Sequence, residues 1–488
     1  MGKKKKTILS DAVMFLVLLL LSTAVLLVFS DSTSPLYPYN YGIDSAFNRF
    51  VGLNILRNKI LYKDIWDHKG PLLFLIQAVG AIGGTRNAGP SLVFFLQILS
   101  LSVSLFFCWK SNTVSDLKNN AFIHYPFFLF ASVLSLLVFS KTIEGGNLNE
   151  EWCLPFISCS LFLFAKYSDS GKNRHPRLYS FVHGVCCGVI AFIRVNNGLP
   201  VFCGLAVIAL RLAKEREWRN IVENILSGIL GFSFVAIPVL FYFSANNAFS
   251  EMIHATFIHN IKYMANETHI TLSFKKLSVR FIPVFASLLI LLVSVLRSGK
   301  MKTLDLILSA AATGSAVMLI CCNIYLHYFT VFVPVFLVIF LNYFRLRNIS
   351  GVTAAAGLLI LFGCVYVMPL PGKIEQPVYT YVSSIPKKEK SSMISIWTSP
   401  EIYLNSGLMP ISRFSSYQYK FFAVNADMKD EFVANISNEI PMRIMVLSGH
   451  EDRLYPEIRQ LLENKYKFET TDGDADIYKR VLTASPKK

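Results

Sequence analysis

The sequence predicts an all-α polytopic membrane protein that carries a small α/β domain at its C-terminal end. Of the 488 residues, 53% are hydrophobic and only 16% are charged, and the mean hydropathy is +0.47. These values are typical of chains that cross a bilayer many times. Apolar runs of spanning length recur along the chain, and basic residues cluster between alternate runs. Beyond Pro369-Leu370-Pro371-Gly372 the hydropathy falls, which indicates a soluble unit.

About eleven runs are predicted to be transmembrane helices, since a bilayer core needs about 20 apolar residues. Two short neighbours among them could instead form one re-entrant hairpin, and this would leave all later orientations unchanged. The first run lacks a clear small-x-small cleavage site, so we expect an uncleaved span rather than a signal peptide. The predicted spans are Ala12–Ser30, Ser91–Trp109, Ala121–Ser140, Trp152–Ala165, Leu178–Phe192, Leu199–Leu212, Ile221–Ser244, Phe281–Leu296, Leu304–Leu319, His327–Phe344 and Gly351–Met368.

The formal net charge of +16 belongs to the membrane part, because residues 371–488 hold nearly equal numbers of basic and acidic side chains. No nucleic-acid partner is therefore expected, and the lipid bilayer is the partner that the composition implies. Lys and Arg stay on the cytoplasmic side during insertion. The pattern predicts the cytoplasmic (inner) membrane, a cytoplasmic N-terminus and an extracytoplasmic C-terminal domain. The basic clusters are Lys3–Lys6; Lys110 and Lys118; Lys166, Lys172, Arg174 and Arg177; Arg211, Lys214, Arg216 and Arg219; Arg297, Lys300 and Lys302; Arg345 and Arg347.

The first external loop is predicted to contain two helices that do not cross the membrane. Pro71–Gly84 is apolar but too short to span, and Pro71 suits the first turn of a helix. Ser45–Lys59 has apolar residues at helical spacing, which predicts an amphipathic helix lying at the membrane surface. In the C-terminal part, Arg443–Leu447 and Ala475–Val481 are predicted strands and Tyr455–Tyr466 a helix. The predicted domains are residues 1–370, in the membrane, and residues 371–488, outside it.

The predicted topology places the unusual polar residues on one side of the membrane. The first loop brings Asp44, in Tyr41-Gly42-Ile43-Asp44-Ser45, and the run Trp66-Asp67-His68-Lys69-Gly70-Pro71. Asp44 could act as a general base or a metal ligand, or could be a turn residue after Gly42. Lys69 could pair with a phosphate or extend along an interfacial helix to water. Asp67 and His68 could tune Lys69 or cap the helix that follows.

Later loops add a second set of candidates. Glu144 precedes Gly145-Gly146-Asn147, where glycines allow close backbone approach, although a polar turn is the simpler interpretation. Arg194 and Asn196 lie between two short apolar segments, and broken helices in a membrane often line a site. His259, His327 and Tyr328 occur beside aromatic residues, where a histidine can also be a hydrogen-bonded interfacial residue. We find no P-loop and no Gly-x-Ser-x-Gly motif, which disfavours ATP-driven transport and serine hydrolysis.

These residues resemble the GT-C fold membrane glycosyltransferases, specifically the protein O-mannosyltransferase-like and aminoarabinose-transferase-like enzymes that use polyprenyl-phosphate sugars. The resemblance rests on Asp44, on the run from Leu61 to Leu72, on Glu144 and on the C-terminal external domain. It implies that Asp44 is the essential first-loop acid and that Lys69 contacts the donor phosphate. The second acidic position in the family is often Asp, so Glu144 leaves a divalent metal ion at Asp44 and Glu144 an open question.

The resemblance implies transfer of a sugar, a hexose or pentose, from a polyprenyl-phosphate donor to a cell-envelope acceptor at the outer face of the membrane. Lys69 and Arg194, with His259, would stabilise the departing phosphate, and Asp44 and Glu144 would be catalytic. Asp67, His68, Asn147, Asn196, His327 and Tyr328 would support them. The alternatives are a transporter or flippase for an envelope lipid or polysaccharide, and a lipid-linked polysaccharide polymerase or ligase.

Overall fold

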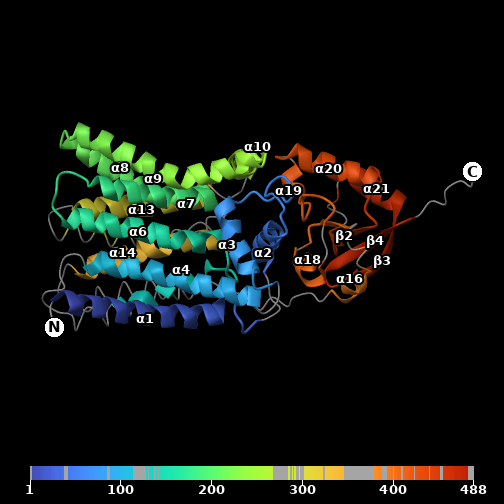
Figure 1. Cartoon of the computed structure of the whole chain (residues 1–488), viewed down its shortest axis with the longest axis horizontal. Helices are drawn as coiled ribbons and strands as arrows, with labels where there is room; N and C mark the ends of the chain where they lie inside the picture. The colour runs from blue at the N-terminus through green and yellow to red at the C-terminus, as the bar shows by residue number, and fades with distance from the viewer. Residues whose placement is uncertain are drawn as a thin grey trace, which may run out of the picture. The chain divides into compact units, whose positions relative to one another are not determined.

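The computed structural model describes residues 3–37, 42–84, 88–113, 142–267, 302–321, 325–345 and most of 379–481, with short pieces between 128 and 140 and between 284 and 296. The chain forms two compact units that each draw on several segments (Figure 1). The first unit contains residues 1–36, 94–242 and 267–372. The second contains residues 37–93, 243–266 and 373–488.

The first unit is built from long apolar helices. Four of the described helical segments are long and apolar enough to cross a membrane: Leu9–Phe29, Leu92–Ser111, Arg177–Lys214 and Trp218–Ala245. Three predicted spans, Ala121–Ser140, Phe281–Leu296 and Gly351–Met368, lie wholly or mostly outside the described residues, so the eleven crossings stay a prediction. The helices of this unit are α1 (Lys3–Phe29), α4 (Ala88–Thr113), α6 (Asn149–Asp169), α7 (Arg177–Arg194), η1 (Val195–Gly198), α8 (Leu199–Lys214), α9 (Trp218–Ala245), α13 (Thr303–Cys321), η3 (Leu326–Val331) and α14 (Phe332–Arg345).

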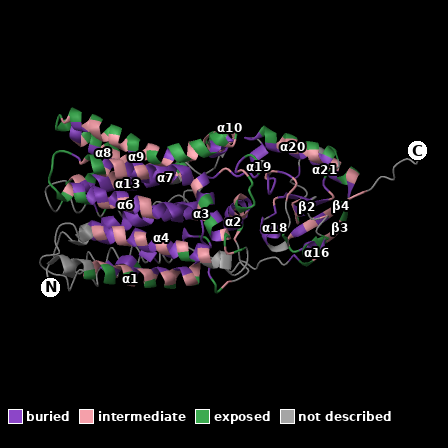
Figure 2. Cartoon of the chain, in the orientation of Figure 1, coloured by how far each residue is buried: buried purple, intermediate pink, exposed green. Residues whose placement is uncertain are grey.

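Helix α9 shows the surface expected of a helix in lipid. Only 11% of its membrane-spanning window is buried, and Figure 2 shows exposed residues along much of its length. Phe234 and Phe241 are 69% and 73% exposed. Such a continuous apolar face would be costly in water, because each Å² of apolar surface left there costs about 25 cal/mol. In a bilayer, where the same apolar surface faces lipid, this cost does not arise.

The helices of the first unit connect two ends of different chemistry. At one end, which we call the basic end, Lys110 pairs with Asp11 at 2.8 Å and Arg211 donates to the Thr303 hydroxyl at 2.6 Å. At the opposite end of α7 lies Arg194, which donates to the Tyr328 hydroxyl at 2.6 Å. The basic clusters were predicted to share one side of the membrane. Those that the structure describes lie at the basic end of the first unit. That this end faces the cytoplasm stays a prediction.

The second unit packs the first-loop helices with the C-terminal sheet. The sheet has the order β1-β2-β4-β3, with β1 and β2 parallel and the other pairs antiparallel. The predicted strands at Arg443–Leu447 and Ala475–Val481, and the helix between them, are confirmed. The elements are α2 (Ile43–Leu56), α3 (Pro71–Ala81), α10 (Phe249–Ile253), the π-turn η2 (His254–Ile258), α11 (His259–Glu267), α16 (Thr380–Ser384), β1 (Met393–Ile396), α18 (Glu401–Ser406), α19 (Tyr419–Phe422), α20 (Ala426–Ser437), β2 (Arg443–Leu447), α21 (Pro456–Lys465), β3 (Tyr466–Asp472) and β4 (Ala475–Arg480).

Helix α2 occurs where the sequence predicts it, but its polar residues are not on a free surface. Asn48, Arg49 and Asn54 are all buried, and the ring of Phe50 stacks on Tyr403 of α18 at a centroid distance of 5.2 Å. The sequence pattern of an interfacial helix does not reveal this cover, because α18 lies some 350 residues later in the chain. One face of the helix is therefore a packing surface within the second unit.

Gly52 sets how closely α2 approaches α3. A Cβ atom built on Gly52 would lie 2.5 Å from the backbone carbon of Gln77. We therefore expect Gly52→Ala to force the two helices apart and to destabilise the protein by about 1–3 kcal/mol, the usual cost of overpacking. Thermal unfolding of the purified chain measures this. Gly228→Ala is the matched control, because its Cβ would meet only Ser180 O at 3.6 Å; equal melting temperatures for both variants would contradict the prediction.

Candidate active site

In the second unit, Lys69 lies between two carboxylates. Its Nζ atom is 3.4 Å from Asp44 Oδ1 and 3.6 Å from Asp67 Oδ2. The Lys69 and Asp67 side chains are each 6% exposed, whereas that of Asp44 is 48% exposed. A buried ammonium needs such partners, because removing an unpaired charge from water is very costly. The first loop therefore holds one inner ion pair and one carboxylate that reaches solvent.

The backbone around Lys69 is fixed by its neighbours. The Asp67 side chain accepts a hydrogen bond from the Lys69 backbone N–H at 2.9 Å, and the Tyr62 hydroxyl donates to the Lys69 carbonyl at 2.7 Å. Burial, with the negative charge of Asp67 adding a smaller effect, raises the pKa of Tyr62 well above 10. Its hydroxyl thus stays protonated and keeps donating. Pro71 then begins α3, as predicted.

Asp44 reaches Lys69 because of the way α2 begins and packs. Gly42, with φ of 62°, precedes the helix, and Asp44 lies in its first turn, where a negative charge is favourable. The close crossing at Gly52 holds α2 against α3. Asp44, at the start of α2, is thereby brought beside Lys69, which precedes α3.

An aromatic cluster covers the same loop. The His259 ring lies 5.1 Å from Trp66, 5.6 Å from His68 and 5.2 Å from Phe421, measured between ring centroids. The Asn260 side chain donates to the His68 carbonyl at 2.7 Å. The sequence singled out His68 and His259, but gave no signal that Phe421, from the C-terminal segment, would pack on both.

His259 is fully buried, and neither of its ring nitrogens has a hydrogen-bond partner among the described residues. Burial, with the positive charges of His254 and Lys262 adding to it, lowers the pKa of His259 to about 4. The ring is therefore neutral near pH 7. The geometry favours a role in holding His68 and Trp66 in place over a direct charge on a phosphate.

The second set of candidates meets in the first unit, around an unusual loop. Glu144, Gly145, Gly146 and Asn147 have successive φ values of 42°, 92°, 88° and 62°. All four are left-handed, a conformation that is strained for Glu and tolerated by Asn. The Ser32 hydroxyl contacts the Gly145 carbonyl at 2.7 Å and the Gly146 carbonyl at 3.0 Å. The end of α1 thus holds the loop in this shape.

Side chains from this loop and from η3 form polar pairs. Glu144 Oε2 lies 2.5 Å from His327 Nδ1, and Asn147 accepts a hydrogen bond from the Trp152 indole at 3.2 Å. Tyr328 is buried beside His327. The strained loop therefore aims the Glu144 carboxylate at a histidine 183 residues away in sequence.

Arg194 lies at a break between helices, as the sequence predicts. Its backbone is extended, with φ of −163°, and η1 follows before α8 begins. The guanidinium lies 4.9 Å from the centre of the Tyr328 ring and 3.8 Å from the buried carboxylate of Glu150. Asn196 is half-buried within η1. Glu150 was not among the predicted site residues, although its place in the first turn of α6, opposite a broken helix, was the available signal.

The two carboxylates named for a metal ion, Asp44 and Glu144, belong to different units and each contacts a nitrogen group. Among the residues that the structure describes, no group of three or more His, Cys, Asp or Glu side chains could hold a metal ion.

The neutral state of His259 makes the stability of the second unit depend on pH. Because its folded pKa of about 4 is below the ordinary 6.5, the unfolded chain binds a proton first as the pH falls. Its contribution is complete above pH 6.5 and is lost between pH 6.5 and 4, by up to about 3 kcal/mol. His259→Phe should flatten this part of a melting-temperature profile, and His254→Phe, at a partly exposed position, should not. An unchanged profile for His259→Phe would contradict the assignment.

Solved structures with a similar fold are membrane glycosyltransferases. ArnT from Cupriavidus metallidurans, bound to undecaprenyl phosphate, matches with 12% sequence identity and a TM-score of 0.56, and the match covers 100% of each chain. The oligosaccharyltransferase AglB from Archaeoglobus fulgidus, in complex with an inhibitory peptide and a dolichol-phosphate, matches with 13% identity and a TM-score of 0.52. That match covers 97% of this chain and 75% of AglB. The predicted GT-C fold is confirmed.

No curated protein matches the sequence. One family model, described as "Putative competence-induced protein Ccs4 N-terminal domain", matches residues 3–351. Because the match spans most of the 488 residues, the chain belongs to this Ccs4 N-terminal domain family.

Proposed function

We propose that this protein is a glycosyltransferase that moves a sugar from a polyprenyl-phosphate donor to a cell-envelope acceptor at the outer face of the cytoplasmic membrane. The observation that carries the proposal is the buried Lys69 ammonium, held by Asp67 on one side and by the exposed Asp44 on the other. The lipid phosphates bound to ArnT and AglB support a donor of this kind. The acceptor is a hydroxyl or amine group of a lipid, glycan or protein.

The two carboxylates on Lys69 differ in how easily they can be replaced. Asp67 is 6% exposed and also accepts the Lys69 backbone N–H, whereas Asp44 is 48% exposed. A donor phosphate that approaches the ammonium would displace Asp44 and leave the inner pair with Asp67 intact. Donor binding would therefore release the Asp44 carboxylate beside the bound sugar, where it becomes available as a base.

The transfer step follows from these positions. The acceptor nucleophile attacks the anomeric carbon of the sugar, and its proton passes to Asp44. The bond between that carbon and the phosphate oxygen breaks, and the electron pair leaves on the phosphate. Lys69 stabilises the charge that grows there, which is the largest single contribution in many transfer reactions. General-base assistance by Asp44 contributes about 10²–10⁴-fold.

The remaining predicted residues take supporting roles in the proposal. Asp67 holds the Lys69 backbone, His68 lies 3.6 Å from the Asp67 carboxylate, and His259 keeps the aromatic cluster in place as a neutral ring. The candidates of the first unit form a polar cluster of their own, in which Arg194 contacts Tyr328 and Glu144 contacts His327. The donor-phosphate role of Arg194, the catalytic role of Glu144 and the supporting roles of Asn147, Asn196, His327 and Tyr328 stay predictions from the sequence. A multi-pass topology with about eleven crossings and domains at 1–370 and 371–488 completes the proposal.

Two variants of the ion pair separate binding from chemistry. Asp44→Asn should lower kcat by about 10²–10⁴-fold and leave donor binding at least as tight, because a competitor for Lys69 is lost. Lys69→Ala should weaken donor binding by about tenfold or more and lower turnover as well. Transfer from a labelled polyprenyl-phosphate monosaccharide and donor binding by purified protein measure the two effects.

Matched controls for these variants lie in the same loop. Asp64→Asn and Lys63→Ala alter exposed side chains that lie three and four residues before Asp67. Each should leave transfer within about twofold of wild type. Melting curves establish that all four variants fold. Near-normal transfer by both Asp44→Asn and Lys69→Ala would refute the site.

The direct attack predicts inversion at the anomeric carbon, since no protein nucleophile intervenes between donor and product. Nuclear magnetic resonance of product made from a donor of defined configuration reads this out. A product that keeps the donor configuration would require a covalent intermediate and rule out the mechanism. Movement of intact donor across a vesicle membrane, without any sugar transfer, would favour the transporter alternative.

A further inference from the structure

The first unit contains a cavity of about 500 Å³ between α7, α8 and α9, away from Arg194 along α7. Its walls are mainly apolar side chains, among them Phe202, Ile225, Ile229 and Phe232. Helices α7 and α9 approach closely beside the cavity. A Cβ atom built on Gly184 would lie only 2.0 Å from the Gly228 carbonyl oxygen, so there is no room for a side chain at this crossing. An apolar space of this volume suits a hydrocarbon chain.

One corner of this cavity is polar and incompletely satisfied. His183 is 1% exposed, and neither ring nitrogen has a hydrogen-bond partner among the described residues. Its ring stacks on Phe164 at 4.5 Å. His175 Nδ1 contacts the Ser180 hydroxyl and the Asn224 side chain at 3.1 Å, while its Nε2 has no partner within the described part of the chain. Buried polar groups left unpaired are costly, so this corner favours a ligand with hydrogen-bonding groups.

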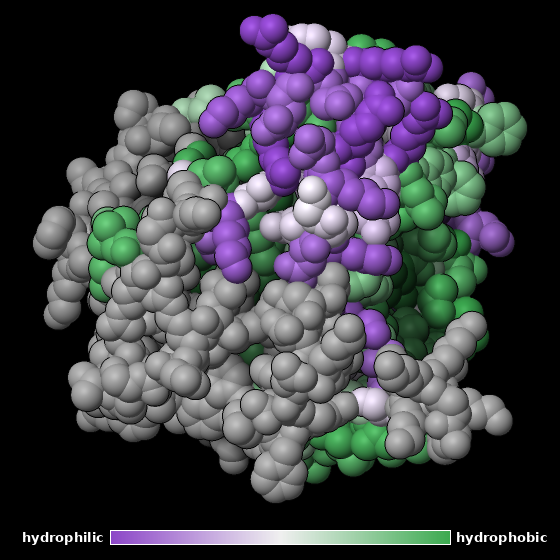
Figure 3. Space-filling view, turned by 90° about the vertical axis from the view of Figure 1, so that its left-hand side faces the viewer, coloured by the Kyte–Doolittle hydropathy of each residue, from purple (hydrophilic) through white to green (hydrophobic). Residues whose placement is uncertain are grey.

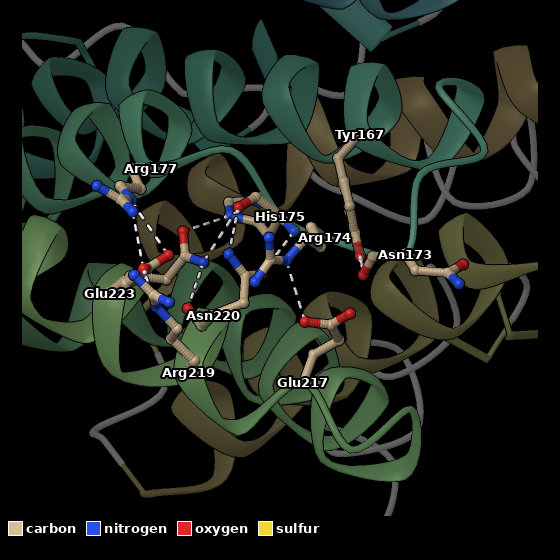
Figure 4. A network of polar contacts seen from close by, with 10 residues as sticks. Tyr167, Asn173, Arg174, His175, Arg177, Glu217, Arg219, Asn220 and Glu223 are labelled. Atoms are coloured by element: carbon tan, nitrogen blue, oxygen red, sulfur yellow. Dashed lines mark hydrogen bonds and ion pairs between the residues drawn. The ribbon is translucent and has the colours of Figure 1, made fainter.

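The rim of the cavity lies at the basic end and is positively charged. Figure 4 shows Glu223 between Arg177 and Arg219, and Arg174 paired with Glu217. Residues 166–177 and 211–223 together hold eight Lys or Arg but four Asp or Glu. Lys214 and Arg216 are exposed and form no ion pair with any described residue. Figure 3 views this end and shows hydrophilic side chains gathered at the top, next to apolar atoms.

We propose that this cavity binds an anionic diacyl phospholipid from the membrane leaflet at the basic end. Its phosphate would lie among the rim cations, an ester carbonyl would accept a hydrogen bond from His183, and one acyl chain would fill the space between α8 and α9. His183 is six residues beyond Arg177, or about 9 Å deeper along the helix. That depth corresponds to the glycerol ester region below a phosphate that lies at the rim.

The depth of His183 also separates this lipid from a polyprenyl phosphate. A polyprenyl phosphate has only hydrocarbon directly below its phosphate, so it would leave the His183 nitrogens unpaired. The phospholipid site is therefore distinct from the proposed donor site, and its test does not depend on sugar transfer.

The test uses full-length protein purified in a mild detergent and depleted of lipid. It is incubated with micelles that contain phosphatidylglycerol, phosphatidylcholine or undecaprenyl phosphate, and native mass spectrometry counts the bound lipid. We expect phosphatidylglycerol to bind at least about tenfold more tightly than phosphatidylcholine, a difference of the size that one charge-assisted contact gives. Undecaprenyl phosphate, which the proposed donor site would hold, should bind alongside phosphatidylglycerol without displacing it. Equal binding of phosphatidylcholine, or displacement of phosphatidylglycerol by undecaprenyl phosphate, would overturn the proposal.

Variants locate the binding. Ala209→Trp fills the cavity and should abolish retention of phosphatidylglycerol, whereas Leu210→Trp, at a side chain 70% exposed and outside the cavity lining, should retain it. His183→Phe keeps the stacking on Phe164 and should weaken binding about tenfold. If Ala209→Trp fails to fold, His183→Phe still tests whether the lipid binds in this cavity. Wild-type retention by His183→Phe, or by a folded Ala209→Trp, would refute the site.

Discussion

The arrangement of the first loop depends on one constraint, the burial of the Lys69 ammonium. An ammonium withdrawn from water must keep its charge compensated at short range. Asp67 does so from within the same turn, and Asp44 does so from another helix. The contact of Tyr62 with the Lys69 carbonyl and the glycine at the α2–α3 crossing both serve to keep these groups within reach. Their shared effect is an ammonium held in a fixed position between two carboxylates.

The first unit shows the same principle in its backbone. Four successive left-handed residues, from Glu144 to Asn147, persist because Ser32 at the end of α1 binds the carbonyl oxygens between them. Backbone strain of this kind persists only where several surrounding contacts hold the strained conformation in place. Here it directs Glu144 to His327, and the break at Arg194 similarly turns a guanidinium toward Tyr328. In the first unit, the strained or interrupted backbone and the polar candidate residues therefore occur at the same positions.

Local signals in the sequence were sufficient for the elements and for much of the site. Pro71 marked the start of α3, a short apolar run marked the buried strand at Arg443–Leu447, and the break at Arg194 followed from two short apolar segments. The proximity of Asp44 and Lys69 could also be expected from their common loop. The packing of Phe421 on His68 and of Tyr403 on Phe50 could not, because each involves a C-terminal residue whose contact leaves no periodic trace in the sequence. The neutrality of His259 likewise follows from burial, which composition does not report.

The second unit is assembled from three separate segments, and this affects how the chain folds during biosynthesis. The segments are residues 37–93, 243–266 and 373–488. The loop that carries Asp44 and Lys69 emerges from the ribosome early, yet Tyr403 and Phe421, which pack on it, are made hundreds of residues later. Contacts of such sequence separation form slowly, because a long loop must close first. The nascent chain must therefore insert its first helices while this unit is still incomplete, and Phe50 and His68 gain their C-terminal packing partners only late in synthesis.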